Sequence, residues 1–157
     1  MIECFRDKNK CFFHEYIYRG ENHLNIGLLG FGTIGTGVYE LINLNKGRFA
    51  KNLDEKVVIT KILDKDPNKK VAEEDKVARV VTNPDDIMDD PEIEIVIALL
   101  GGMDFEYGLI KRALQSGKHV VTANKAVISE YFEELLTIAA ENNVILRYEA
   151  SVGGGIP

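Results

Sequence analysis

The feature that most constrains the fold is a glycine-rich stretch between a short apolar run and an amphipathic one. Residues 26–29 are mainly apolar, residues 30–35 read Gly-Phe-Gly-Thr-Ile-Gly, and an amphipathic run follows. This order predicts a strand, a tight turn and a helix. Gly30 lets the chain turn sharply, Gly32 leaves bare backbone for a pyrophosphate, and Gly35 lets the helix lie against the sheet. The unpaired amides at such a helix start stabilise an anion, so the stretch predicts a dinucleotide site.

The same hexapeptide also occurs by chance in loops, so its context decides between the two interpretations. Here a strand precedes it, a helix follows it, and a second apolar run over residues 57–63 ends in Asp64. An acid at the end of the second strand is typical of dinucleotide-binding units. The context therefore favours a cofactor site over a chance loop.

Composition narrows the class of protein. The chain has 157 residues, 45% of them hydrophobic, and a net charge of −6. This length predicts one domain with a sizeable core. The sequence shows no basic stripe for nucleic acid and no apolar run long enough for a membrane span. Cys4 and Cys11 form no CxxC pair and are interpreted as reduced thiols, which together with the absence of a signal peptide predicts a cytoplasmic protein.

The periodicity of the chain predicts an α/β fold. Residues 1–23 show no clear period and are interpreted as an N-terminal extension, whereas residues 24–157 are interpreted as a dinucleotide-binding domain. In chain order we expect strand 26–29, helix 34–44, loop 45–55, strand 57–63, short strand 80–81, a helix start at 83–86, strand 93–100, helix 104–116, strand 119–122, helix 129–142 and strand 144–148. This alternation predicts a Rossmann-type, doubly wound parallel sheet with helices on both faces.

Several chemically distinctive residues follow predicted strands directly. They are Gly30, Gly101, Lys125 and Gly153. Ligands of doubly wound sheets bind beyond the carboxyl ends of the strands, where the strand order reverses. We therefore expect these residues to converge on one edge of the sheet.

Asp64 bears on the choice of dinucleotide. An acid there accepts both ribose hydroxyls of an adenosine and repels a 2′-phosphate, although a solvated turn aspartate is the plainer alternative. Lys65, Lys69 and Lys70 follow at once and attract a 2′-phosphate. The sequence thus favours NAD and leaves NADP open.

Two later segments offer polar groups near the same edge. Lys125 follows the fifth strand and is suited to a carboxylate or carbonyl oxygen, although a lone lysine is more often a surface residue. Glu149 precedes a glycine-rich turn at residues 151–155 whose exposed carbonyls suit a hard cation, although a flexible exit from the sheet is the alternative.

Four segments together resemble the NAD(P)-binding domain of homoserine dehydrogenase. They are residues 30–35, 100–102, 117–126 and 148–157, and the resemblance covers residues 25–157 in unbroken order. The resemblance implies interconversion of homoserine and aspartate 4-semialdehyde, with hydride transfer to or from NAD(P), in threonine, methionine and isoleucine biosynthesis. It also implies a small-molecule substrate and a homo-oligomeric intact enzyme.

The resemblance also assigns roles to individual residues. Lys125 matches the family lysine beside the nicotinamide and the substrate, and is the expected catalytic residue within this chain. It places the pyrophosphate at residues 30–35 and the cofactor against residues 100–102. With Asp64, Lys65 and Thr122, which the strand ends themselves suggest, the expected cofactor-binding positions are Gly30, Phe31, Gly32, Thr33, Ile34, Gly35, Asp64, Lys65, Leu100, Gly101, Gly102, Thr122 and Lys125. A sodium ion is expected at Glu149 by its side chain and at Val152, Gly154 and Ile156 by their carbonyls.

Two departures from the family pattern stand out. After Gly101 and Gly102 the family usually has an acid and then Pro-Ala, whereas Phe105 and Glu106 stand here, so we expect a reshaped helix start. The sequence also ends at Pro157, where the family enters its substrate and dimerisation domain. The main acid/base residue is therefore expected beyond this position, and the chain alone is expected to bind dinucleotide weakly without turnover.

Two rival functions remain open from the sequence. A related Rossmann oxidoreductase acting on a semialdehyde is one, but the phosphorylating kind requires a catalytic cysteine, and Cys4 and Cys11 lie far from any strand end. A stand-alone NAD(P)-binding redox-sensing module is the other.

Overall fold

The computed structural model describes residues 23–53, 55–73 and 75–148. The strands in this part of the chain are β1 (His23–Leu29), β2 (Lys56–Leu63), β3 (Arg79–Val81), β4 (Ile95–Ala98), β5 (His119–Thr122) and β6 (Leu146–Tyr148). The helices are α2 (Thr33–Leu44), α3 (Lys46–Leu53), α4 (Asp85–Met88), α5 (Asp104–Gln115) and α6 (Lys125–Glu141).

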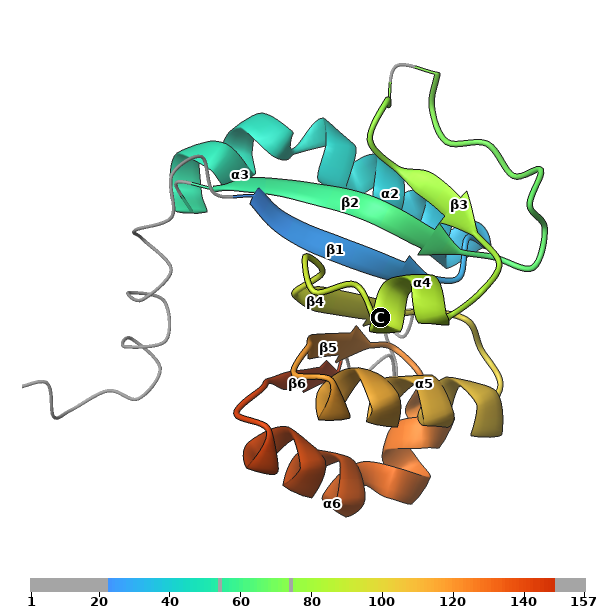
Figure 1. The fold of residues 1–157 in the computed structure, drawn as a ribbon, viewed down its shortest axis with the longest axis vertical. Helices are drawn as coiled ribbons and strands as arrows, with labels where there is room; N and C mark the ends of the chain where they lie inside the picture. The colour runs from blue at the N-terminus through green and yellow to red at the C-terminus, as the bar shows by residue number, and fades with distance from the viewer. Residues whose placement is uncertain (1–22, 54, 74, 149–157) are drawn as a thin grey trace, which may run out of the picture.

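The strands form one parallel sheet in the order β3-β2-β1-β4-β5-β6 (Figure 1). The chain builds outwards from β1 to β3 and then returns to the other side of β1 with β4. The strand order therefore reverses between β1 and β4, which is where such sheets bind ligands. The predicted Rossmann-type α/β fold is confirmed.

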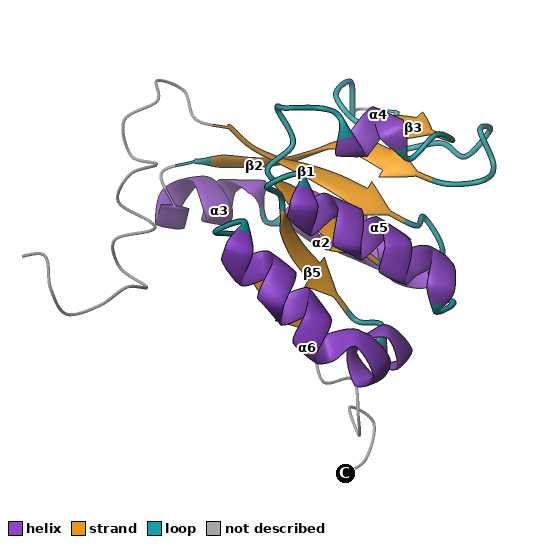
Figure 2. Cartoon of the chain, turned by 60° about the horizontal axis from the view of Figure 1, so that its bottom comes forward, coloured by secondary structure: helices purple, strands orange, loops and turns teal. Residues whose placement is uncertain are grey.

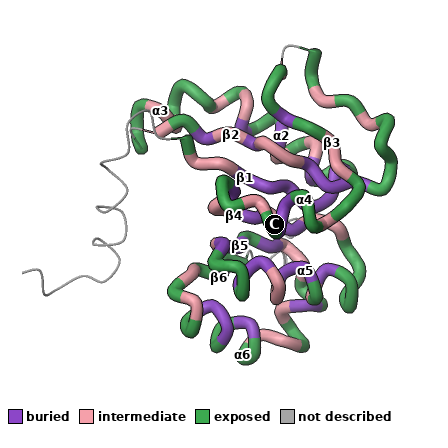
Figure 3. Tube along the Cα trace, in the orientation of Figure 1, coloured by how far each residue is buried: buried purple, intermediate pink, exposed green. Residues whose placement is uncertain are grey.

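Helices cover both faces of the sheet, and each face has its own hydrophobic core. Figures 1 and 2 show α2 and α3 on one side of the strands and α5 and α6 on the other. Along β1, Ile26 and Leu28 belong to the cluster under α2, whereas Leu29 belongs to the cluster under α4, α5 and α6. This split follows from the alternation of side chains along a strand. Figure 3 shows the buried segments concentrated in the strands and on the inner sides of the helices.

Two glycines allow the backbone to pack closely at the sheet's reversal point. Gly30 has a φ of +100°, and a Cβ there would lie 2.7 Å from the carbonyl oxygen of Leu99, which follows β4. A Cβ on Gly35 would lie only 2.0 Å from the carbonyl oxygen of Gly30. Any side chain at Gly35 would therefore push α2 away from the end of β1.

The sequence-based prediction of a loop at residues 45–55 is wrong, because α3 occupies Lys46–Leu53. Most of this helix faces solvent, and the half-buried Phe49 is the residue that packs against the core under α2. A single apolar anchor gives almost no periodic signal. Other boundaries also differ: α6 begins at Lys125 instead of 129, and β4 and β6 are shorter than expected.

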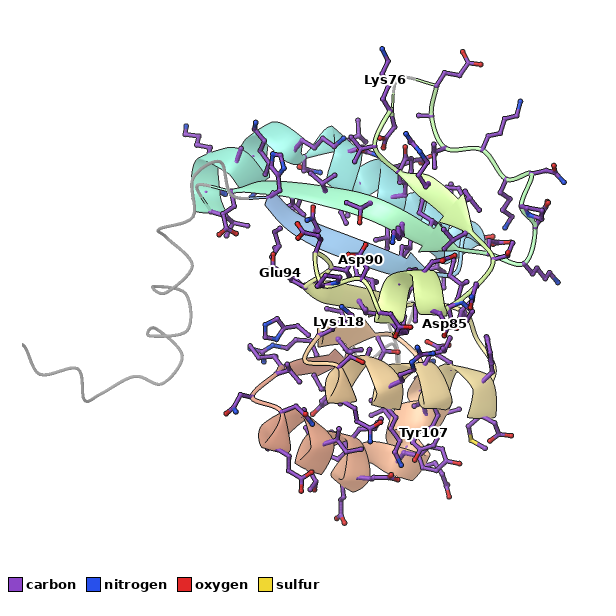
Figure 4. All side chains as sticks on the ribbon, viewed as in Figure 1. Lys76, Asp85, Asp90, Glu94, Tyr107 and Lys118 are labelled. Atoms are coloured by element: carbon purple, nitrogen blue, oxygen red, sulfur yellow. The ribbon has the colours of Figure 1, made fainter. Side chains whose placement is uncertain are left out.

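The amino ends of the strands are held by a buried lysine. Lys118 is 4% exposed, and its Nζ donates to the carbonyl oxygens of Asp90 at 2.6 Å and Ile93 at 2.9 Å. Burial lowers the pKa of Lys118, and the nearby carboxylates of Asp90 and Asp89 partly oppose this. Figure 4 labels Lys118 and Asp90 beside one another. Lys118 therefore ties the loop before β5 to the loop before β4, away from the carboxyl edge.

The described residues contain neither a membrane-spanning helix nor a metal-binding cluster. No helix there is long and apolar enough to cross a bilayer. No group of His, Cys, Asp and Glu side chains in the same residues is arranged to hold a metal ion.

We predict that Gly35→Ala destabilises the chain by about 1–3 kcal/mol or more, because its methyl group overlaps the Gly30 carbonyl. Gly37→Ala is the matched control, since it lies in the same helix and a Cβ there meets nothing within 4 Å. The control should be neutral or stabilising by about 0.5–1 kcal/mol. Urea denaturation measures both, and equal stability of the two variants would contradict the packing described.

Candidate functional site

A cavity of about 600 Å³ lies at the carboxyl edge of the sheet, where the strand order reverses. Three segments at the strand ends line it: residues 32–34 at the start of α2, residues 98–103 from the end of β4 onwards and residues 123–126 at the start of α6. Glu106 of α5 completes the lining. The predicted convergence of strand ends on one edge is therefore confirmed for these segments.

The start of α2 presents free backbone to this cavity. Gly32 is the N-terminal cap residue, makes no side-chain cap, and is exposed, and a Cβ on it would meet nothing within 4 Å. The first turn contains no acidic residue, and the Thr36 amide is bonded to the Gly32 carbonyl at 2.8 Å. Unpaired amides and an unopposed helix dipole favour an anionic ligand. At Gly32 no side chain blocks the approach of an anion to the start of α2.

Asp64 lies behind the glycine turn and is 7% exposed, so it is not the solvated turn residue of the plainer interpretation. Its carboxylate accepts hydrogen bonds from the Phe31 amide at 3.2 Å, the Asp66 amide at 3.0 Å and Lys69 Nζ at 2.8 Å. Burial raises the pKa of this carboxyl, but the bonds from Lys69, Asp66 and Phe31 outweigh it and lower the pKa below its ordinary value. The carboxylate therefore fixes the turn after β1 to the end of β2.

Lys69 joins this contact from the loop after β2. Its Nζ donates to the Phe31 carbonyl at 2.5 Å as well as to Asp64. The side chain of Phe31 itself is buried and packs edge-on against Tyr39, with ring centroids 5.6 Å apart. Phe31 thus meets Asp64 and Lys69 through its backbone, while its ring anchors α2 to the core.

The other half of the cavity rim comes from the loops after β4 and β5. Gly101 and Gly102 have φ values of +78° and +82°, a conformation that few side chains adopt. Asn124 caps α6 by accepting from the Ala126 amide at 3.1 Å and the Val127 amide at 3.2 Å. Lys125 is the first residue of α6, is exposed and lines the cavity.

The predicted site residues fall into four groups. Those lining the cavity are Gly32, Thr33, Ile34, Leu100, Gly101, Gly102 and Lys125. Those buried behind the cavity rim are Gly30, Phe31, Gly35, Asp64 and Thr122, while Lys65 is exposed beyond the end of β2. The predicted sodium ligands Glu149, Val152, Gly154 and Ile156 lie outside the described residues.

Glu106 is a site residue that the sequence reasoning did not assign. Its only signal was its place in the departure from the family pattern after Gly102. The helix start predicted to be reshaped has Met103 as its cap residue, with no side-chain cap. Glu106 instead turns back from the first turn of α5 and accepts from the Gly101 amide at 2.7 Å.

Known proteins resemble this chain in sequence and in fold. The sequence profile of the family described as "Homoserine dehydrogenase, NAD binding domain" matches residues 30–149. The chain belongs to this family. Homoserine dehydrogenase of Lactococcus lactis is 40% identical over 136 residues, which are 85% of this chain and 32% of that protein. The Bacillus subtilis homoserine dehydrogenase is 40% identical over 134 residues, which are 85% of this chain and 31% of that protein.

Solved structures of homoserine dehydrogenases share the fold. The Thiobacillus denitrificans enzyme superimposes with a TM-score of 0.78 at 34% identity, over 89% of this chain and 32% of that one. The Staphylococcus aureus enzyme at pH 7.5 gives a TM-score of 0.78 at 35% identity, over 85% of this chain and 33% of that one. The chain spans about a third of the length of the relatives it matches.

We predict that Asp64→Asn costs about 1–2 kcal/mol of stability at pH 7, because it weakens a buried acceptor shared by three donors. The pKa of Asp64 in the folded chain lies below 3.8, so its contribution is fully present above the unfolded-state pKa and is lost as the pH falls through the folded-state value. The difference in the free energy of unfolding between wild type and variant should therefore shrink as the pH falls from about 5 to about 2.

Urea denaturation over that range measures this difference. Asp66→Asn, at an exposed position in the same turn, is the control and should cost much less. A difference that stays constant down to the lowest pH would contradict the role assigned to the Asp64 carboxylate.

Proposed function

We propose that this chain binds a nicotinamide dinucleotide, with the diphosphate at the start of α2. One observation carries the proposal: Gly32 is exposed, lines the cavity and leaves open space where a side chain would stand. The helix start behind it has no acidic residue that would repel the phosphates. Asp64 and Lys69 lie on the β2 side of the turn, where the adenosine half of a dinucleotide binds in such folds. The nicotinamide half of the cofactor then binds against the loops after β4 and β5.

For the whole protein we propose the activity of homoserine dehydrogenase, the interconversion of L-homoserine and L-aspartate 4-semialdehyde. Its relatives carry this name over their full lengths, of which the present chain matches about a third. The nicotinamide ring, when bound, supplies the hydride chemistry. This chain's part is to hold the cofactor and to present the Lys125 ammonium at the cavity rim, where it is available to a carboxylate or carbonyl oxygen of the substrate.

The choice between NAD and NADP depends on the end of β2. The Asp64 carboxylate there favours ribose hydroxyls, whereas the Lys69 ammonium 2.8 Å from it, with Lys65 and Lys70 nearby in sequence, offers charge to a 2′-phosphate. Parallel calorimetric titrations with NADH and NADPH decide between them. Tighter binding of NADH supports the role of Asp64, and tighter binding of NADPH supports that of the lysines.

We predict that Gly32→Val weakens dinucleotide binding by about tenfold or more, because a branched side chain occupies the space reserved for the diphosphate. The free energy of unfolding should fall by no more than about 1 kcal/mol, the cost of a poorer helix cap, since a side chain at Gly32 would face open space. Gly37→Ala in the same helix is the control and should bind like the wild type. Undiminished binding by a folded Gly32→Val variant would refute the proposed site.

A further inference from the structure

Glu106 is the most deeply buried carboxylate in the part of the chain that the structure describes. It is 0% exposed, against 7% for Asp64, and it lies in the first turn of α5 beside the cavity. No lysine, arginine or histidine of the described residues forms an ion pair with it within 4 Å. A carboxylate without such a partner stays buried only where several hydrogen-bond donors converge on it.

Three donors do converge on Glu106, and they come from both loops on one side of the cavity. Its Oε2 accepts from the Gly101 amide at 2.7 Å and from the Asn124 side-chain amide at 3.0 Å. Its Oε1 accepts from the Thr122 hydroxyl at 3.4 Å. The start of α5 adds the favourable end of a helix dipole. One carboxylate therefore joins the loop after β4 to the loop after β5.

Asn124 extends this connection to the start of α6. Its amide nitrogen also donates to the Gly102 carbonyl at 2.6 Å, while its oxygen caps α6 immediately before Lys125. The backbone amide of Asn124 donates to the Thr122 hydroxyl at 3.1 Å. The orientation of Lys125 toward the cavity thus depends on the residue that Glu106 holds.

The two glycines after β4 depend on hydrogen bonds from neighbouring side chains to stay ordered. Gly101 and Gly102 are both exposed and both have positive φ, so neither has a side chain to anchor it. Glycine backbone loses more conformational entropy on ordering than any other. Hydrogen bonds to the Gly101 amide and the Gly102 carbonyl hold this loop at the cavity wall.

We infer that Glu106 is a positioning residue for the nicotinamide half of the cofactor, because it fixes the two loops that form that half of the cavity. The inference rests on the proposed function. It adds that the nicotinamide half and the diphosphate half of the site are held in place by different residues. Loss of Glu106 impairs binding of the nicotinamide end and leaves the diphosphate cradle at α2 intact, because the hydrogen bonds of Glu106 among the described residues go to Gly101, Thr122 and Asn124 and none goes to residues 30–36.

The test compares two ligands by calorimetry. NADH spans both halves of the cavity, whereas ADP offers only the adenosine and diphosphate that the first half takes. Glu106→Ala should weaken NADH binding by about tenfold or more and change ADP binding by less than about twofold. Glu106→Gln keeps an oxygen for the Gly101 and Asn124 donors and should restore NADH binding to within about threefold of the wild type. Asp104→Ala, in the same turn but exposed, is the control.

Hydrogen exchange and a second variant test the role of Glu106 independently of the Glu106→Ala titration. Amide hydrogen exchange at Gly101 in the ligand-free chain should accelerate by about tenfold or more in Glu106→Ala and little in Glu106→Gln. If Glu106→Ala does not fold, Asn124→Ser serves instead, because serine still caps α6 but does not reach Glu106 or Gly102. The Asn124→Ser variant should bind NADH more weakly than the wild type and bind ADP equally well.

The outcomes separate the two hypotheses. Wild-type chain that binds neither ligand would refute the proposed function, whatever the exchange rates show. Wild-type binding with an equal loss of NADH and ADP in Glu106→Ala, or with no loss of NADH, would overturn the role of Glu106 alone. Unchanged Gly101 exchange in Glu106→Ala would also overturn it.

Discussion

The structure depends on the close approach of backbone to backbone where β1, β4 and α2 meet. Gly30 follows β1 in a left-handed conformation next to the Leu99 carbonyl, and Gly35 brings α2 against the Gly30 carbonyl. This contact directs the start of α2 at the point where the strand order reverses. Because an exposed glycine caps that helix, no side chain at this position stands between the start of α2 and the cavity.

Two buried carboxylates stabilise the two sides of that cavity by the same means. Asp64 holds the turn after β1 through the Phe31 amide and Lys69, and Glu106 holds the loops after β4 and β5 through Gly101, Thr122 and Asn124. Each carboxylate therefore accepts from the backbone of a glycine-containing loop. Such charge-assisted bonds are stronger than those between neutral groups, so they suit segments that otherwise lack anchoring side chains.

Most of the fold could be predicted from the sequence because its signals are local. Apolar runs ending in Gly30, Asp64 and Gly101 marked strands whose carboxyl ends share one edge, and alternation with helices implied a parallel sheet. The helix α3 escaped prediction because Phe49 alone of its apolar residues packs against a core cluster. The buried state of Asp64 and the role of Glu106 escaped it because both depend on donors distant in sequence. The Phe31 amide is 33 residues from Asp64, and Asn124 is 18 from Glu106.

The most direct test of the account is a map of backbone amide chemical-shift changes by NMR as NADH is added to the chain. The largest changes are expected at the amides of residues 32–35, with further changes at Gly101, Gly102 and Lys125. Residues at the amino edge of the sheet, such as Lys118, should not respond. Changes centred at that edge, or an unperturbed start of α2 under saturating NADH, would contradict the claim that the exposed helix start holds the diphosphate.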